Sequence, residues 1–288
     1  MANRTGQFTM GYHLRTNITR AFIYLFLSFL VLLCIVPLWI LFINATRNTP
    51  EIQSGISLIP STHFLDNYRY LVGKSFNLVI GFVNSMYLSL SITVLSVYFS
   101  TLTAYAITVY NFRGREFLKN FVYALVLIPQ QVSIIGFFGY MAKLGLTDTY
   151  YPLILPAIAS AGSVFFARQY LETCVIKDLI FAARVDGCSE FGIFHKIMVP
   201  IAKPGMYTMA IFSFVGSWNN LFTPTIMLTS TDKYTLPMLV QLLRGDMYRT
   251  EYGAIYFGLF ISVIPVILIY SFLAKYIVSG LTLGAVKE

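Results

Sequence analysis

Apolar residues in this sequence come in six runs, separated by shorter stretches that hold most of the charged residues. A helix of about 20 apolar residues crosses the hydrocarbon core of a bilayer, and most of the runs reach that length. The predicted spans are residues 21–44, 78–108, 117–144, 152–166, 204–228 and 254–277. The pattern predicts an all-α integral membrane protein with six transmembrane helices, in one domain (residues 21–288) behind a polar tail (residues 1–20).

The second predicted span carries small residues on one helical face. They recur about one or two turns apart and are Ser85, Ser89, Ser96, Ser100, Ala104 and Thr108. Small side chains let membrane helices approach closely, because the backbones can then come into contact. The pattern therefore predicts a face for tight helix packing.

The third predicted span is interrupted at Pro129, Gln130 and Gln131. Two adjacent amides at mid-membrane depth are costly if they face lipid, so at least one should face protein or a water-filled path. Hydrogen bonding between helices would satisfy them equally well. Gln130 and Gln131 are therefore candidates for either a solute path or helix–helix contact.

The composition supports a membrane protein and changes how the charge is interpreted. Hydrophobic residues make up 57% of the chain, charged residues 11%, and the mean hydropathy is +0.71. Soluble domains contain about 25% charged residues. A net charge of +8 could suggest nucleic acid, but lysine and arginine gather in the segments between apolar runs. Their distribution predicts both termini in the cytoplasm and no nucleic-acid partner.

The sequence lacks the residue patterns that are typical of an enzyme or of an ion-driven carrier. It has no phosphate-binding loop of the form G-x-x-x-x-G-K-[ST], and its three cysteines and three histidines are scattered, which predicts neither a disulfide framework nor a metal site. No Asp or Glu lies in a predicted span, which counts against an ion-coupled secondary transporter. Sodium sites built from carbonyls and hydroxyls keep that alternative open. An intramembrane hydrolase would need a base near its serine, and the spans offer none.

A polar stretch, residues 168–203, lies between the fourth and fifth predicted spans. Apolar and small residues recur within it at helical spacing: Leu179, Ala182, Ala183, then Phe191, Phe194, Ile197 and Met198. Asp186 and Gly187 between the two sets form a good turn pair, since glycine accepts backbone angles that a Cβ forbids. The stretch therefore predicts two short amphipathic helices joined by a turn, lying along the membrane face.

This stretch resembles the EAA loop of permease subunits from ABC-type importers, whose pattern is roughly E-A-A, three residues, G, nine residues, I-x-L-P. Phe181-Ala182-Ala183 corresponds to E-A-A, Gly187 to the glycine, and residues 197–200 to the ending. The resemblance implies a coupling loop that docks in a cleft of an ATPase subunit, with Phe181, Ala182, Ala183, Asp186 and Gly187 in the contact. The chain departs from the family at Phe181, where Glu is usual. An ordinary amphipathic cytoplasmic loop is the alternative.

Two further segments resemble the carbohydrate-uptake class of these permeases, typified by the smaller permease of maltose-type importers. Ser217-Trp218-Asn219-Asn220 is similar to the motif S-W-N-E, and residues 280–287 read G-L-T-L-G-A-V-K. The resemblance suggests a sugar path, with Gln130, Gln131, Trp218, Asn219 and Asn220 as its candidates. Amides and aromatic rings suit a neutral polyol, because they hydrogen-bond and stack without a charge partner. The alternative role for each is structural contact between helices.

The resemblance also implies the remaining parts of an importer. These are a second, different permease subunit, two copies of an ATPase that binds ATP and Mg²⁺, an external solute-binding protein and a sugar substrate, in the cytoplasmic membrane of a bacterium or archaeon. This chain itself would have no cofactor, no metal and no catalytic residue. In maltose-type systems the main sugar site lies on the other permease subunit. A non-sugar solute remains an alternative, and the sequence does not say which sugar is carried.

Overall fold

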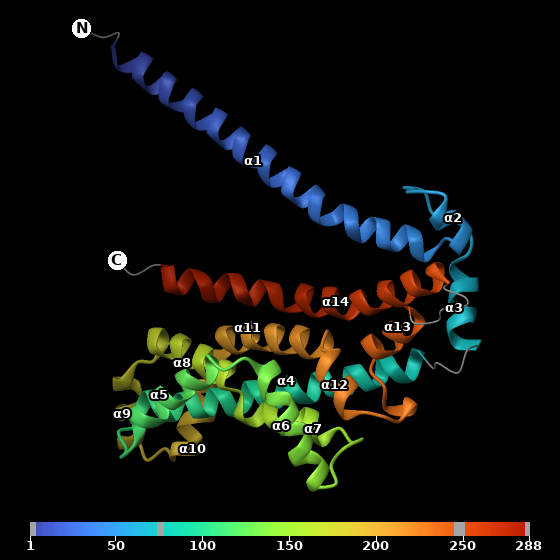
Figure 1. The fold of residues 1–288 in the computed structure, drawn as a ribbon. Coiled ribbons are helices and arrows are strands. Elements are labelled where there is room, and N and C mark those ends of the chain that lie inside the picture. The colour runs from blue at the N-terminus through green and yellow to red at the C-terminus, as the bar shows by residue number, and fades with distance from the viewer. Residues whose placement is uncertain (1–3, 74–77, 245–250, 286–288) are drawn as a thin grey trace. The chain divides into compact units, whose positions relative to one another are not determined.

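The computed structural model describes residues 4–73, 78–244 and 251–285, which contain helices and no strand. They form two compact units: residues up to 70 with 251–260, and residues 71–250 with 261 onward. The all-α fold expected from the apolar pattern is confirmed. Helix α14 (Tyr252–Ala285) contributes to both units, and Figure 1 shows the elements along the chain.

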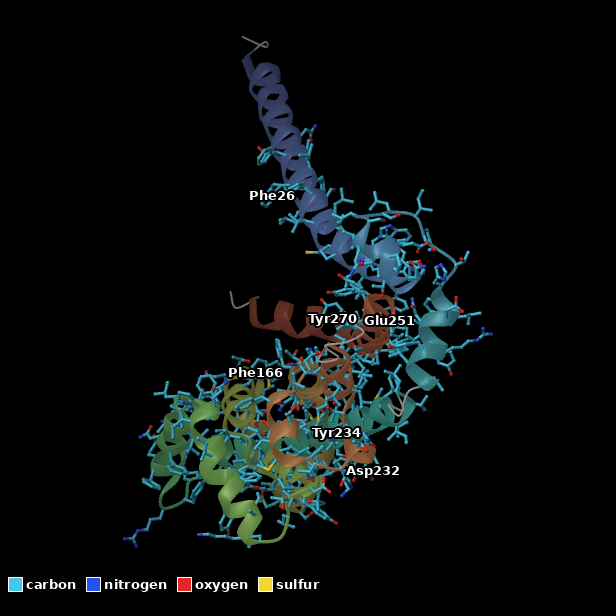
Figure 2. The ribbon with its side chains drawn as sticks, turned by 45° about the vertical axis from the view of Figure 1, so that its right-hand side comes forward. Phe26, Phe166, Asp232, Tyr234, Glu251 and Tyr270 are labelled. Carbon is cyan, nitrogen blue, oxygen red and sulfur yellow. The ribbon has the colours of Figure 1, made fainter. Side chains whose placement is uncertain are left out.

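The first unit contains the long helix α1 (Arg4–Ala45), the short helix α2 (Thr49–Gln53), most of α3 (Phe64–Gly73) and the first turns of α14. Asn67 of α3 closes the end of α1: its amide Nδ2 donates to the carbonyls of Ala45 (2.9 Å) and Arg47 (3.0 Å). The last carbonyls of a helix have no partner within it, so this buried amide satisfies that of Ala45. From residue 19 to residue 39, α1 is exposed and mostly apolar, as at Phe26 in Figure 2.

The second unit is organised around α4 (Leu78–Val109), which packs against α8 (Ala161–Cys174) and α11 (Val199–Trp218). The small-residue face predicted from the sequence is buried, since none of its six members is more than 8% exposed. Small side chains here allow the helices to pack closely. The remaining helices are α5 (Arg115–Val126), α6 (Gln130–Lys143), α7 (Tyr151–Ile154), α9 (Lys177–Val185), α10 (Glu190–Ile193), α12 (Phe222–Met227) and α13 (Leu236–Arg244).

Five helical segments are long and apolar enough to cross a membrane: residues 19–45, 78–109, 151–174, 190–218 and 252–274. A sixth span would be α5 and α6 together, which are bent by 104° at the break near Pro129. The interruption expected there is therefore a sharp bend. The number of six spans stays a prediction.

The segment 190–218 starts earlier than the predicted fifth span, residues 204–228. Helix α10 continues through a π-helical turn, Phe194–Met198, directly into α11. In a regular α-helix the ring of Pro200 would clash with the carbonyl four residues before it. The wider π-helical turn lies directly before this proline, where that clash would occur. The helix then ends at Trp218, and α12 follows separately. Likewise α8 runs to Cys174, so the stretch 168–203 includes helical residues at both of its ends.

Two connecting segments of the second unit are tied together by Asp148. Its carboxylate accepts hydrogen bonds from the backbone N–H groups of Thr229 and Ser230 (2.9 Å each) and pairs with Lys233 Nζ at 2.8 Å. Lys233 first, and then the other donors, hold the pKa of this carboxyl well below its usual range.

The second connecting segment is also fixed to α4. The Asn84 amide donates to the carbonyls of Asp232 (2.8 Å) and Tyr234 (3.0 Å), two residues labelled in Figure 2. The connections at this end of the unit are thus held by polar contacts to each other and to the central helix.

Candidate functional site

The turn between α9 and α10 has a complete helix-ending motif. The N–H of Gly187 donates to the carbonyl of Arg184 (3.0 Å), and the N–H of Cys188 donates to that of Ala183 (2.9 Å). This pair of bonds is the Schellman motif, which requires a left-handed residue at the position of Gly187. Gly187 has a φ of +78°, as the motif needs. Ser189 then begins α10, since its Oγ accepts from the N–H of Gly192.

Helices α9 and α10 lie together at one end of the second unit, as Figure 1 shows. We refer to residues 175–198 as the α9–α10 loop. Its inner face is buried, with Ile180 2% exposed and Ile193 fully covered. Its outer face exposes large apolar side chains, among them Phe181 (57%), Val185 (87%) and Phe191 (67%). Exposed apolar clusters of this kind are typical of interaction surfaces.

Four of the five predicted coupling residues lie on the exposed side of the loop, and one does not. Phe181, Ala182, Asp186 and Gly187 are exposed. Ala183 is only 8% exposed and packs in the cluster that contains Ile180 and Phe194. Ala183 therefore contributes to helix packing within the chain rather than to the exposed surface.

A polar network that the sequence does not reveal holds the loop to α4. The guanidinium of Arg184 pairs with both carboxylate oxygens of Glu190 (2.7 and 3.2 Å). Tyr110, just after α4, donates its hydroxyl to the same carboxylate. The guanidinium carbon also lies 5.5 Å from the centre of the Tyr110 ring and 5.6 Å from that of Phe181. The network therefore joins α9, α10 and α4.

Partial burial, followed by its hydrogen bond to Glu190, raises the pKa of Tyr110. The hydroxyl accordingly stays protonated and can donate throughout the physiological range. The only sequence signal for this network was the pair of opposite charges on either side of the glycine turn. Tyr110 is 80 residues from Glu190, and no local pattern connects them.

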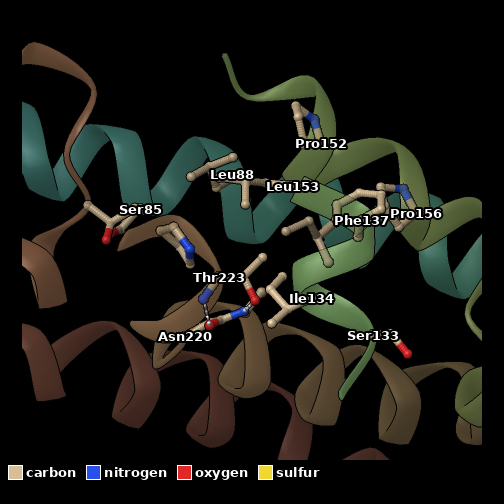
Figure 3. Close-up of a pocket in the computed structure, with 14 residues that line it drawn as sticks. Ser85, Leu88, Ser133, Ile134, Phe137, Pro152, Leu153, Pro156, Asn220 and Thr223 are labelled. Carbon is tan, nitrogen blue, oxygen red and sulfur yellow. Dashed lines mark hydrogen bonds between the residues drawn. The ribbon is translucent and has the colours of Figure 1, made fainter. Parts of the chain in front are cut away.

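Two cavities lie at the other side of the second unit. The first, about 250 Å³, is lined mainly by α4, α6, α7 and α12, with Pro156 after α7 and Ser217 at the end of α11, and is shown in Figure 3. The second, about 390 Å³, is lined by Gln131, Asn219 and Asn220 together with neighbours on α6 and α12. Ile134, Asn220 and Thr223 line both cavities. The described residues that line them include no ionisable side chain, so their polar groups are amides and hydroxyls.

The structure brings three of the predicted path residues together and separates another from them. Gln131, Asn219 and Asn220 share the second cavity. Asn220 is also a local cap, because its Oδ1 accepts from the N–H of Thr223 at 3.2 Å, drawn in Figure 3. Trp218 is 1% exposed and its indole N–H donates to the Ser262 carbonyl (2.8 Å), which supports the structural alternative for this residue. The side chain of Gln130 lies outside the described residues.

Comparison with known proteins identifies the family. Residues 96–283 match the family described as binding-protein-dependent transport system inner membrane component. The chain belongs to this family. The arabinooligosaccharides transport system permease protein AraQ of Halalkalibacterium halodurans is 39% identical to this permease over 263 residues, 90% of this chain and 94% of that one. The trehalose/maltose transport system permease protein MalG of Thermococcus litoralis is 29% identical, over 90% and 93% of the two chains.

A solved structure shares the fold of the permease. It is a crystal structure of a bacterial ABC transporter involved in the import of the acidic polysaccharide alginate, with a TM-score of 0.78 and 22% identity over 90% of this chain and 96% of that one. The family and the relatives make the permease a multi-pass membrane transport protein rather than an enzyme. It is a component of a binding-protein-dependent transport system, and the alternative of an ion-coupled secondary transporter is not favoured.

Proposed function

We propose that this permease is one of two different membrane subunits of an ATP-driven importer for a neutral sugar or oligosaccharide. The substrate class is inferred from the cavity that Gln131, Asn219 and Asn220 line together. The side chains around this cavity offer amide and hydroxyl groups and no charge. Such groups bind a polyol by hydrogen bonds alone. The names of the relatives, which include arabinooligosaccharide and trehalose/maltose permeases, support the same class.

In this proposal the α9–α10 loop docks on a separate ATPase, which supplies the phosphate-binding loop that this sequence lacks. Phe181 replaces a carboxylate that the family usually has, so the contact depends on burial of Phe181, Val185 and Phe191 rather than on an ion pair. An external binding protein delivers the sugar. The chain would lie in the cytoplasmic membrane of a bacterium or archaeon, with both termini and the loop in the cytoplasm.

The helical segment Glu190–Trp218 gives this coupling a physical route. At 29 residues and about 1.5 Å per residue, it extends roughly 43 Å from Glu190, within the α9–α10 loop, to Trp218, the residue before Asn219 at the cavity. The segment contains a π-helical turn and two prolines, which are places where helices bend, but it is continuous. In this proposal, movement of the loop by the ATPase reaches the cavity wall along this segment.

The test of the docking step compares three variants in the complex that co-purifies with the permease. Phe181→Ala should reduce recovery of the ATPase and transport, whereas Phe181→Leu should retain more of both because it keeps most of the apolar surface. Phe29→Ala, which removes an equally exposed phenyl ring from α1, is the matched control and should leave ATPase recovery unchanged. Equal recovery with Phe181→Ala and Phe29→Ala would refute docking through the loop.

The substrate class is tested at the cavity. Asn219→Ala should lower sugar transport while ATPase recovery stays normal, since Asn219 lies far from the loop. The binding protein that associates with the complex, captured with its ligand, identifies the solute. A charged ligand in that binding protein would contradict the neutral-sugar proposal and leave the docking step standing.

A further inference from the structure

The loop that follows α2 exposes a cluster of large apolar side chains, which we call the apolar tip (residues 56–60). Ile56 is 84% exposed, Leu58 62% and Ile59 77%. No charged residue lies between Glu51 and Ser61, so the whole loop is uncharged. In water such a cluster would be expected to fold inward, because exposing apolar surface is unfavourable.

The tip cannot fold inward, because the chain on both sides of it is fixed. Arg47, only 7% exposed, donates from Nη1 to the carbonyl of Gly55 (2.9 Å) and from Nη2 to that of Glu51. After the tip, the N–H of Ser61 donates to Thr46 Oγ1 at 2.8 Å. The protein therefore presents the apolar side chains on a rigid support.

Around Leu58 and Ile59, part of the backbone of the tip is paired within the protein. The N–H and carbonyl of Ile59 both bond to Ser57 Oγ at 3.1 Å, and the carbonyl of Leu58 accepts from the Trp39 indole at 3.2 Å. Pro60 has no N–H. Paired groups can leave water without losing hydrogen bonds, and the other backbone groups of the tip can keep theirs to water and headgroups in the interfacial layer.

The bond from Trp39 also fixes the depth of the tip. Trp39 is 45% exposed on α1, whose neighbouring residues Ile35 and Leu38 are apolar and exposed as well. It lies about 9 Å before the end of this helix, by the rise of about 1.5 Å per residue. Tryptophan is enriched where a span meets the lipid headgroups. The tip is thus continuous with the lipid-facing surface of α1, at the level of the membrane interface.

We propose that the apolar tip inserts into the interfacial layer of the lipid bilayer at the C-terminal end of α1. The occupant is lipid: Ile56, Leu58 and Ile59 enter the boundary between headgroups and acyl chains, and Trp39 lies beside them. The tip holds the C-terminal end of α1 at a fixed depth in the bilayer. Because Arg47 bonds the carbonyls of Glu51 and Gly55, α2 is held at a fixed depth as well. A protein partner on this surface is the competing explanation.

The experiment places an environment-sensitive fluorophore (NBD) on single cysteines in the assembled transporter, reconstituted in lipid nanodiscs. Three native cysteines are first replaced by serine: Cys34, Cys174 and Cys188. The reporter positions are Ile59→Cys and, as a second variant on the tip, Ile56→Cys. Leu32→Cys on the exposed surface of α1 is the lipid control, and Arg69→Cys on α3 is the water control.

Probes at Ile59 and Ile56 should show blue-shifted emission, strong quenching by doxyl-labelled lipids as at Leu32, and weaker quenching by aqueous iodide than at Arg69. Two outcomes would overturn the proposal. Iodide quenching equal to that at Arg69, without lipid quenching, would place the tip in water. Protection from both quenchers, lost when the co-purified subunits or the binding protein are removed, would assign the surface to a protein partner.

Discussion

Replacement of Gly205 by alanine should loosen the packing of α11 on α8. A Cβ built at Gly205 lies 2.5, 2.6 and 2.8 Å from three carbon atoms of the Tyr170 ring. Carbon atoms in contact prefer about 3.5–4.0 Å, so the ring would have to withdraw by about 1 Å. The atoms met include Cγ at the base of the ring, which cannot move without moving the side chain or helix α8.

The magnitude follows from two opposing effects. Overpacking of this kind costs about 1–3 kcal/mol. Alanine in a helix interior is favoured over glycine by about 1 kcal/mol, which offsets part of that cost. Gly216→Ala, in the same helix with no atom within 4 Å of the new Cβ, receives only the favourable effect. The two variants should therefore differ by about 1–3 kcal/mol in stability, with Gly205→Ala the weaker.

The assay is the apparent thermal midpoint of the fluorescently tagged permease in detergent, read from the monodisperse peak in size-exclusion chromatography. A second comparison, Gly205→Ala in a Tyr170→Leu background, isolates the contact, because the penalty should shrink when the ring is absent. Equal midpoints for Gly205→Ala and Gly216→Ala would refute the close approach of α8 and α11. A loss of stability from Gly205→Ala that is equally large in the Tyr170→Leu background would also refute it.

Three further predictions concern the loop and the connecting segments. Gly187→Val should lower binding-protein-stimulated ATP hydrolysis, since a left-handed conformation costs a side chain roughly 1–2 kcal/mol; Gly187→Asn should retain more activity, and equal activities would contradict the conformational argument. Tyr110→Phe removes one hydrogen bond to Glu190, worth about 0.5–1.5 kcal/mol, and should weaken the same coupling without loss of membrane insertion; unchanged coupling would show that the hydroxyl is dispensable. For Asp148 the folded-state pKa is depressed, so its stabilisation is complete above the unfolded pKa of about 3.9 and is lost as the pH falls towards the folded value. The stability difference between the wild type and Asp148→Asn should therefore be constant above about pH 5 and shrink only below about pH 4, as thermal midpoints across that range would show.

The features predictable from the sequence are those that depend on neighbouring residues. The all-α membrane fold follows from apolar runs, and the packing face of α4 follows from small residues at helical spacing. The turn at Gly187 follows from an Asp-Gly pair between two amphipathic segments, and the glycine has the positive φ that such a turn requires. In each case the local chemistry alone determines the outcome.

The features that the sequence could not predict depend on distant contacts. Trp218 belongs to a motif that suggested a solute path, yet its indole N–H donates to Ser262, 44 residues further on. The network of Arg184 and Glu190 is completed by Tyr110 from another helix. The sequence also could not separate the inward-facing Ala183 from Ala182, because both fit the same pattern until the packed face of α9 is known.

The π-helical turn Phe194–Met198 gives the segment from α10 to α11 tolerance to a change in length. Hydrogen bonds in such a turn join residues five apart rather than four, so the turn holds one residue more than a turn of α-helix. Deleting one residue within it would restore regular α-helix, and the helical parts on either side would keep nearly the same orientation. The direction of α9 and α10 relative to the cavity would therefore survive a one-residue deletion at this position.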